Sequence, residues 1–509
     1  MHPHVLDWEN KPLLFKIYPT LEVTRLPRDF RETGMPALTA IAAPSASTGK
    51  ESIPDLETLA ELLFFSAGVT RSKKHPQGET FFRAAACTGA LYEIELYVVC
   101  TELASKTPGQ PALPAGVYHF GAAEFGLRQL RSGDFRSALV EATGGDPAVA
   151  HAPVIVICTG TYWRNAWKYH SRTYRHFGWD NGTILANLLA MSAAAKLPAS
   201  VVAGFVDQQV NALLDLDTKK EVAFSIAAIG HMNSEPQPAP PIPKLTLPVV
   251  AYSQQEVEYP AMRKMQEASS LDSANEVSAW RAKHGGTDPL VRPASKASAS
   301  GLPKMPAPKG TTVPLDMLEK AATATDTIEQ VISRRGSTRQ FSRDPITLQQ
   351  LALMLDRSTQ GIPADFLDSQ QSHLNELHLI VNNVAGLTAG AYVYHWERKL
   401  LELLKAGDFR DKAGYLGLEQ QLPADAALDV FFLADLKKIL EKYGNRGYRA
   451  VQLEAGILGG KLYLAAYAQR LGATGLTFYD DDVVGFFSPH AKGKSAIFLV
   501  ALGRSALRR

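Results

Sequence analysis

An internal repeat is the feature that most restricts how this chain of 509 residues can fold. The motif KYHSRTYR, beginning at Lys168, recurs as KYGNRGYR beginning at Lys442, a separation of 274 residues. The same separation maps one GDFR tetrapeptide onto a second, and Asp207 onto Asp481. Separated motifs do not recur in one register by chance, so we infer that two copies of one domain are fused. We expect the copies to pack as an intramolecular pseudo-dimer, as the subunits of a two-fold homodimer do.

A change of composition separates the two copies. Residues 236–248 contain six prolines, which fix φ and remove backbone donors, so this stretch is neither a helix interior nor a central strand. The same region ends in a run rich in Pro, Ser and Ala, which is typical of a connector. We therefore expect a domain at 1–232, a linker at 233–310 and a second domain at 311–509.

Both copies mix segments of strand and helix character. Apolar residues recur at helical spacing in 453–464 and in the matching segment 184–193, which predicts one long helix in each copy. Strands and helices without a strict βαβ alternation indicate an α+β fold, in which helices pack on a sheet. We expect strands at 91–99, 154–158, 223–229, 377–381, 391–396, 428–433 and 495–502. The small residues Ala455, Gly456, Gly459 and Gly460 would let another helix approach closely.

Composition narrows the class of protein. Lys and Arg together number 53 against 51 Asp and Glu, a net charge of +2, so charge gives no reason to expect a nucleic-acid partner. Three cysteines without a CxxC motif or a Cys/His cluster indicate reduced thiols and no metal site. No signal peptide and no apolar run of the ~18 residues that a membrane helix needs is evident. We therefore expect a cytoplasmic protein without a membrane partner.

Two segments have the composition of ligand-binding loops. The sequence RRGSTRQF at 334–341 places guanidinium groups on either side of a hydroxyl, a donor set suited to phosphate oxygens, although basic runs near helix ends also interact with the helix dipole. In RAAACTGALY at 83–92, small residues would let a flat ligand lie against the backbone, and Cys87 is either reactive or simply packed. Neither a GxGxxG nor a GxxxxGK[ST] loop is present, so the usual nucleotide sites are not indicated.

The repeated motif supplies candidates for proton transfer. Lys168 and Tyr169 in the first copy, like Lys442 and Tyr443 in the second, pair an amine with a phenol. Burial lowers the pKa of a lysine and can make it a base or a proton donor, whereas a surface or helix-capping pair would have no chemical role. Both interpretations remain open from the residues alone.

The motifs taken in order resemble the nitroreductase superfamily, and more narrowly its SagB-type dehydrogenase branch in a tandem form. They include RAAACTGALYEIELYVV, LPAGVYHF, RGSTRQF, KYGNRGYR and GILGGKLYLAAYAQRLGATGLTFYDDD, and they cover both halves of the chain. The resemblance implies FMN-binding α+β domains with the flavin at the interface between two copies. It also implies an activity that reduces nitro groups or quinones with NAD(P)H, or one that oxidises peptide azolines.

The resemblance assigns roles to individual residues. The flavin phosphate and ribityl chain would be held by Arg335, Ser337, Arg339 and Arg504. The ring would be contacted from the other copy by Cys87, Thr88 and Gly89. The segment that passes the ring edge would be Gly475, Leu476, Thr477 and Phe478. The catalytic pair would be Lys442 and Tyr443 or Lys168 and Tyr169, and sequence does not decide which pair faces the flavin.

Departures from the family pattern reduce the expected number of sites. The first copy lacks the RxSxR motif and ends its last strand in Gly230 and His231, where the second has Gly503 and Arg504. The second copy in turn replaces the small-residue loop by DSQQSHLNELHL. Because these losses fall on opposite sides of the same pseudo-symmetric site, we predict one composite site and one FMN per chain.

We therefore expect an FMN-dependent oxidoreductase that transfers a hydride through flavin N5 to or from a small molecule or a peptide azoline, with NAD(P)H as the electron donor of the reductive route. The alternative is a non-catalytic flavin-binding or scaffold protein with a degenerated fold of the same type.

Overall fold

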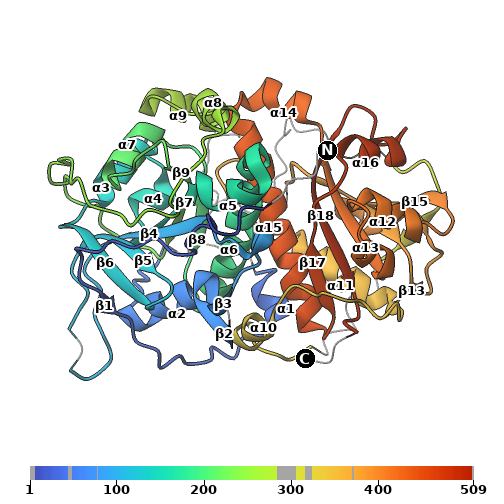
Figure 1. Cartoon of the computed structure of the whole chain (residues 1–509), viewed down its shortest axis with the longest axis horizontal. Helices are drawn as coiled ribbons and strands as arrows, with labels where there is room; N and C mark the ends of the chain where they lie inside the picture. Colours follow the sequence, from blue (N-terminus) through green and yellow to red (C-terminus); the bar gives the residue numbers. More distant parts are fainter. Residues whose placement is uncertain are drawn as a thin grey trace.

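The structure is a computed structural model that describes residues 6–43, 49–76, 78–109, 111–283, 305, 307–315, 324–368 and 372–506. It contains two seven-stranded antiparallel sheets, one in each half of the chain (Figure 1). The order of the strands is the same in both sheets, which confirms the predicted α+β fold and its tandem repetition. The first sheet is ordered β1 (Thr24–Arg25), β6 (Gly126–Ser132), β5 (Gly116–Gly121), β4 (Ile94–Cys100), β7 (Val154–Thr161), β9 (Glu221–Ile229) and β8 (Ala199–Val202). The second is ordered β10 (Thr312–Pro314), β15 (Leu400–Ala406), β14 (Gly390–His395), β12 (Glu376–Val381), β16 (Leu428–Ala434), β18 (Ser495–Gly503) and β17 (Gly472–Gly475).

The central strands are apolar on both faces because helices cover both sides of each sheet. Every residue of β4, β7, β9 and β16 is buried, which explains their runs of Val, Ile, Leu and Phe. The first half has the helices α1 (Ala37–Ala40), α2 (Leu56–Ala67), α3 (Arg136–Ala142), α4 (Pro147–Ala150), α5 (Tyr162–Tyr169) and α7 (Asp207–Leu213). The second has α10 (Ile328–Arg334), α11 (Leu348–Ser358), α12 (Arg410–Leu416), α13 (Gln421–Asp425), α14 (Leu436–Tyr443) and α16 (Asp480–Phe487). Two short two-stranded sheets complete the described strands: β2 (Val69–His75) with β3 (Gly78–Arg83), and β11 (Ile346–Thr347) with β13 (Val384–Ala385).

Two long helices join the halves. They are α6 (Thr173–Ala194) and α15 (Arg446–Ala468), which lie against each other between the two sheets (Figure 1). A Cβ added to Gly182 would lie 2.4 Å from the backbone carbon of Gly456, so only glycine permits this crossing. Gly460 likewise approaches α6, whereas Gly459 faces Phe498 of its own sheet. The expected pseudo-dimer is therefore confirmed. Of the predicted small residues, Gly459 packs against the sheet of its own half and not against α6.

The arginines of the repeated motif hold the halves together. Arg446 and Arg449 of α15 form ion pairs of 2.7 and 2.6 Å with Asp207 of the first half. Arg172 and Arg175 of the first half reach Asp480 in the same way, at 2.9 and 2.5 Å. The partner that corresponds to Asp207 is thus Asp480, and the expected match with Asp481 is wrong by one residue.

The described part of the linker contacts both halves, since Gln266 donates to Asp207 of the first and the Trp280 indole donates to the Tyr443 carbonyl of the second. It contains α8 (Pro260–Ala268) and α9 (Ala274–Ala282), which lie beside α14 (Figure 1). Met262 and Trp280 are its buried anchors, and the Ser273 side chain caps α9 by accepting from the Glu276 amide. Residues 284–304 and 306 of the predicted linker lie outside the described residues. None of the helices that the structure describes combines the length and the hydropathy of a membrane span.

Candidate active site between the two halves

A pocket of about 280 Å³ lies where the two halves meet, and we call it the open pocket. Both halves line it, as predicted for a composite site. The predicted residues that line it are Cys87, Thr88, Gly89, Lys168 and Tyr169 from the first half, and Ser337, Arg339, Gly475, Leu476 and Thr477 from the second.

The first half contributes a tight loop that only glycine can complete. Gly89 has a φ of +66°, and a Cβ there would lie 2.9 Å from the Tyr169 hydroxyl. The loop is fastened to α6 by Asp180, whose carboxyl group accepts from the Thr88 amide at 2.8 Å and from the Thr88 hydroxyl at 2.9 Å. This attachment presents the backbone of the loop to the pocket.

The second half contributes a basic end. Ser337 and Arg339 follow α10, whose first turn is closed by a capping box between Thr327 and Gln330. Across the pocket, burial and then the charge of Arg339 lower the pKa of Lys168. A cation, a hydroxyl and an amine therefore converge on one end of the pocket, which favours an anionic group there.

Two phenols face the pocket, one from each half. Burial raises the pKa of Tyr169, and the neighbouring Asp180 and Cys87 raise it further. Burial also raises the pKa of Tyr463, whose hydroxyl accepts from the Gly475 amide and lies 3.4 Å from the Ser337 hydroxyl. Both side chains are thus neutral and keep their protons, so that they can donate hydrogen bonds.

Two predicted phosphate ligands do not line the open pocket. Arg335 is buried behind it, where the guanidinium donates to the carbonyls of Arg83 and Ala84, each at 2.8 Å. Arg335 therefore holds the segment that leads into the small-residue loop, because its guanidinium group donates to backbone carbonyls of that segment. Arg504 is exposed at the end of β18 and donates to the Pro345 carbonyl at 3.0 Å.

Phe478 also lies outside the lining of the pocket. It is 1% exposed, and the guanidinium groups of Arg172 and Arg175 lie 5.3 and 5.5 Å from its ring. Phe478 therefore packs beside the two arginines that pair with Asp480.

The structure separates the two Lys-Tyr pairs. Lys168 and Tyr169 end α5 and line the open pocket. Lys442 instead approaches Asp368 at 3.5 Å, and the carbonyl of the buried Tyr443 accepts from the Trp280 indole at 2.9 Å. Only the first pair is therefore placed to act in the open pocket.

The place that corresponds to the open pocket on the other side of the pseudo-dimer is filled. We call it the closed region and define it by residues 201–204 and 363–365 with Trp280 and Tyr443. Val201 forms a parallel bridge with Ala364, so the second half adds a segment to the edge of the first sheet.

Side chains complete the filling of the closed region. The Asp365 carboxylate accepts from the amides of Ala203 and Gly204, both at 2.8 Å. A Cβ on Gly204 would lie 3.0 Å from the Trp280 ring, so the indole packs directly on this backbone. By the register of β8 and β17, Val202 matches Leu476 and Ala203 matches Thr477, and both of the matching residues line the open pocket.

Clusters of possible metal ligands occur among the described residues, although sequence gave no reason to expect one. They are Glu376 with His378 and His490, and Cys87 with Glu93 and Asp180, the ligand atoms of each group lying within 4.8 Å of one another. Spacing in the sequence did not indicate them because folding brings together residues that are far apart in the chain.

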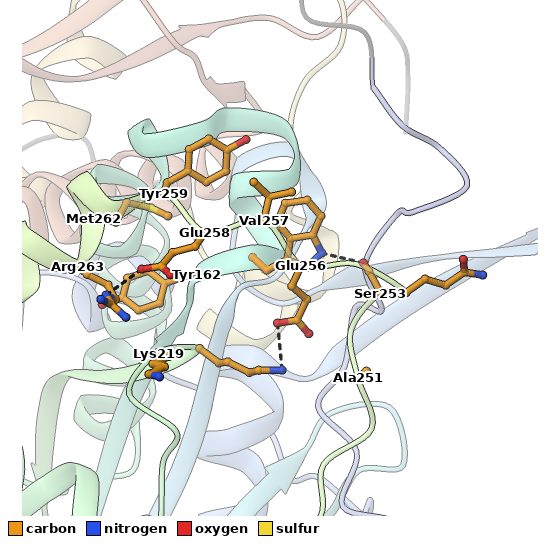
Figure 2. Close-up of a pocket in the computed structure, with 13 residues that line it drawn as sticks. Tyr162, Lys219, Ala251, Ser253, Glu256, Val257, Glu258, Tyr259, Met262 and Arg263 are labelled. Atoms are coloured by element: carbon orange, nitrogen blue, oxygen red, sulfur yellow. Dashed lines mark hydrogen bonds and ion pairs between the residues drawn. The ribbon is translucent and has the colours of Figure 1, made fainter.

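A larger cavity, of about 350 Å³, lies between the linker and α5 (Figure 2). Glu258 and Arg263 form an ion pair of 2.9 Å at its edge, and Trp163 donates to the Ser253 hydroxyl at 2.7 Å. The predicted site residues, all of which belong to the described part of the chain, lie elsewhere.

Sequence reasoning missed several residues of the open pocket. Trp179, Asp180 and Tyr463 lie on α6 and α15, where a polar or amphipathic side chain interrupts an apolar helix. That interruption is a usable signal, because such a residue inside a buried helix needs a polar partner or a pocket. The other missed lining residues are Ala86, Thr183, Gln420, Thr474 and Phe498.

Comparison with known proteins supplies further findings. The protein family described as the nitroreductase family matches residues 50–231 and 332–503. A protein of Methanocaldococcus jannaschii named "putative nitroreductase" is 26% identical over 165 residues, which are 31% of this chain and 81% of that protein. A crystal structure described in the same words, from Anabaena variabilis, aligns with a TM-score of 0.73 at 25% identity and covers 98% of this chain and 95% of its own.

Proposed function

Because the chain belongs to the nitroreductase family, we propose that it is an FMN-dependent oxidoreductase with one flavin site per chain, at the open pocket. The observation that carries the proposal is that each half supplies a different part of this pocket. The second half provides the basic end, and the first half provides the small-residue loop. The closed region supports a single site, since Trp280 and Asp365 occupy the backbone that the second site would need.

The residues of the open pocket fit the chemistry of FMN. Arg339, Ser337 and Lys168 offer charged and neutral donors to a phosphate or to the polar edge of a ring. Ala86 and Gly89 leave room for a flat group beside Trp179 and Phe498. Bound FMN would supply a hydride acceptor and donor, chemistry that side chains cannot perform.

Lys168 and Tyr169 are the groups that we assign to the proton of the substrate. The pKa of Lys168 is lowered by burial and by Arg339, which brings the amine toward the range in which it exchanges protons at neutral pH. Tyr169 keeps its proton and donates a hydrogen bond. A Lys-Tyr pair of this kind supports the SagB-type assignment and an azoline or related small-molecule substrate, with NAD(P)H as electron donor if the pocket works in the reductive direction.

The first test is flavin stoichiometry on the purified full-length protein. We expect about one FMN per chain, released on denaturation. Arg339→Ala should reduce flavin affinity by roughly 10- to 150-fold, because a hydrogen bond to a charged group contributes about 1.5–3 kcal/mol. Arg343→Ala is the matched control, since Arg343 is exposed and pairs with Asp425. No flavin after incubation with excess FMN would reject the proposal.

The same preparation distinguishes an enzyme from a non-catalytic flavin-binding or scaffold protein. Anaerobic addition of NADH or NADPH should bleach the flavin absorbance, and an acceptor should restore it. Bound flavin that neither nicotinamide reduces, and that oxidises no azoline peptide, would favour the non-catalytic function.

A further inference from the structure

Three side chains that can bind a metal ion meet at the inner wall of the open pocket. They are Cys87 on the small-residue loop, Glu93 just before β4, and Asp180 on α6. The Cys87 sulfur lies 3.3 Å from an oxygen of Asp180 and 3.4 Å from an oxygen of Glu93. A zinc ion lies about 2.3 Å from sulfur and about 2.1 Å from carboxylate oxygen, so a tetrahedral ion holds these two atoms about 3.6 Å apart. The three side chains therefore already have nearly the spacing that an ion requires.

The protein supplies too few donors for the two buried carboxyl groups of this cluster. Asp180 is 4% exposed, and Glu93 is fully buried. One oxygen of Glu93 has no hydrogen-bond partner in the described part of the chain. The Cys87 thiol contacts both carboxyl groups but has a single proton, so it donates to only one of them at a time. A buried carboxyl group without a donor needs a partner, and a cation in the middle of the cluster would satisfy both groups.

Hydrogen bonds from the backbone and from Thr88 orient the possible ligands. The Tyr92 amide donates to the Cys87 sulfur at 3.0 Å. The Thr88 amide and hydroxyl donate to Asp180 at 2.8 and 2.9 Å. Side chains that bind metals are held in this way by an outer set of hydrogen bonds, which fixes the direction of each ligand atom. The cluster thus has both the ligands of a metal site and the hydrogen bonds that support them.

The matching position in the other half has no need of an ion. Glu454 corresponds to Asp180 at the same separation of the repeat, 274 residues. Its carboxyl group accepts from the amides of Leu374 and Asn375 and from the Asn375 side chain, and it lies 3.0 Å from a ring nitrogen of His373. Protein donors therefore satisfy the carboxyl group on α15, whereas the cluster on α6 lacks a comparable set.

We propose that Cys87, Glu93 and Asp180 bind one divalent transition-metal ion, and that zinc matches this ligand set best. One thiolate with two carboxylates suits a borderline ion such as Zn²⁺, whereas Mg²⁺ and Ca²⁺ favour sites made of oxygen alone. The thiol proton passes to solvent when the ion binds, and nothing is oxidised or reduced.

The ion joins the small-residue loop to α6 at the wall of the open pocket. Three protein ligands leave the fourth position of a tetrahedral ion to a water molecule, as in zinc sites that remain open to a ligand. Cys87 and Asp180 both line the open pocket, so this position has access to it. All three ligands belong to the first half of the chain, and the proposal therefore goes beyond the flavin site and does not depend on bound flavin.

Cobalt(II) is the probe that reports a sulfur ligand directly. Co²⁺ added to the purified full-length protein, after treatment with EDTA, should produce a sulfur-to-metal charge-transfer band and the visible bands of tetrahedral cobalt. Both should saturate at one ion per chain. Difference spectra recorded with and without Co²⁺ remove the absorbance of any flavin. Zn²⁺ should displace the cobalt and abolish the bands, whereas Mg²⁺ should not.

Variants of the cluster test which side chains bind the ion. Cys87→Ser should abolish the charge-transfer band and weaken zinc binding by more than about 100-fold, since a lost ligand costs more than a lost outer hydrogen bond. Thr88→Val, which removes only an outer hydrogen bond, should keep the band and weaken binding by about 10- to 100-fold. Asp180→Asn retains the thiol and is the second ligand variant if Cys87→Ser fails to fold. His490→Gln is the matched control, because it removes a ligand from the other cluster of possible metal ligands.

The results for the metal and for the flavin are read separately on one preparation. One zinc per chain without flavin would support the inference and reject the proposed function, and flavin without zinc would do the reverse. Failure to bind Co²⁺ or Zn²⁺ at micromolar free metal would overturn the inference. A charge-transfer band that survives Cys87→Ser, or zinc binding that is lost in His490→Gln, would also overturn it, because the ion would then lie elsewhere.

Discussion

The open pocket and the closed region are made from matching parts of one repeat. In the open pocket, Leu476 and Thr477 pass along the wall and leave about 280 Å³ between the halves. In the closed region, Ala203, which matches Thr477, and the following Gly204 donate their amides to Asp365, and the Trp280 ring packs on Gly204. The difference comes from added segments and not from the shared framework, because both sheets keep the same strand order. A site can thus be lost by filling it while the fold that formed it is preserved.

The largest contrast should come from the two sets of ion pairs. Asp207 is buried with Arg446 and Arg449, so Asp207→Asn leaves buried cations without compensation and should cost about 3–5 kcal/mol of unfolding free energy. Asp480 is 36% exposed, and solvent screens its pairs, so Asp480→Asn should cost no more than about 1 kcal/mol. Urea unfolding of both variants measures the difference. An equal loss of unfolding free energy in the two variants would mean that the different burial of Asp207 and Asp480 does not affect the strength of their ion pairs.

Trp280→Ala tests whether the Trp280 indole alone blocks a second flavin site in the closed region, or whether Asp365 blocks it as well. Removing a well-packed indole should cost about 3–5 kcal/mol, since the cavity cannot collapse against the backbone of Gly204. Flavin content should remain near one per chain, because Asp365 still occupies the amides of Ala203 and Gly204. A rise toward two flavins per chain would show that the indole alone blocks a second competent site.

Asp365 should give the closed region a pH dependence of its own. Burial raises its pKa from 3.8 to about 6. The folded state therefore holds this proton more tightly than the unfolded state, and stability from it is lost as the pH rises from about 4 to 6. The shift corresponds to about 3 kcal/mol. Unfolding free energies measured from pH 4 to 7 should fall less steeply in Asp365→Asn than in the parent.

The smallest change concerns the framework that both regions share. Gly182→Ala adds one methyl group against the backbone of Gly456 and should cost about 1–3 kcal/mol by forcing α6 away from α15. Gly485→Ala is the control, because a Cβ there meets no atom within 4 Å, and it should stabilise α16 by about 0.5–1 kcal/mol. Thermal unfolding of the two variants checks both signs. Similar unfolding temperatures for the two variants would mean that α6 and α15 can move apart at Gly182 without loss of stability.

Most of the architecture is predictable from the sequence, because it follows from repetition and periodicity. The predicted strand at 428–433 is β16 with one residue added, and the stripe at 453–464 lies within α15. The match of Asp207 with Asp481 was wrong because one residue is lost between β17 and α16 relative to the first copy, and a fixed offset does not detect a local deletion.

The candidate site was predictable only in part. Loops of small residues and basic motifs indicated Thr88, Gly89 and Arg339, which line the open pocket. Arg335 and Lys442 lie in the same motifs as residues of the pocket, but Arg335 donates to two backbone carbonyls and Lys442 pairs with Asp368 outside the pocket. Such partners depend on how the two halves are packed, which a local pattern does not specify.

Covalent fusion of the two copies has an evolutionary consequence. In a homodimer, one gene encodes both faces of the interface, so any substitution appears twice and a residue that blocks one site blocks the other. Here the linker places Trp280 on one side of the pseudo-dimer only. The first copy likewise does not need an aspartate equivalent to Asp365. Each half can therefore accumulate mutations independently, with one under selection for chemistry and the other for holding it in place.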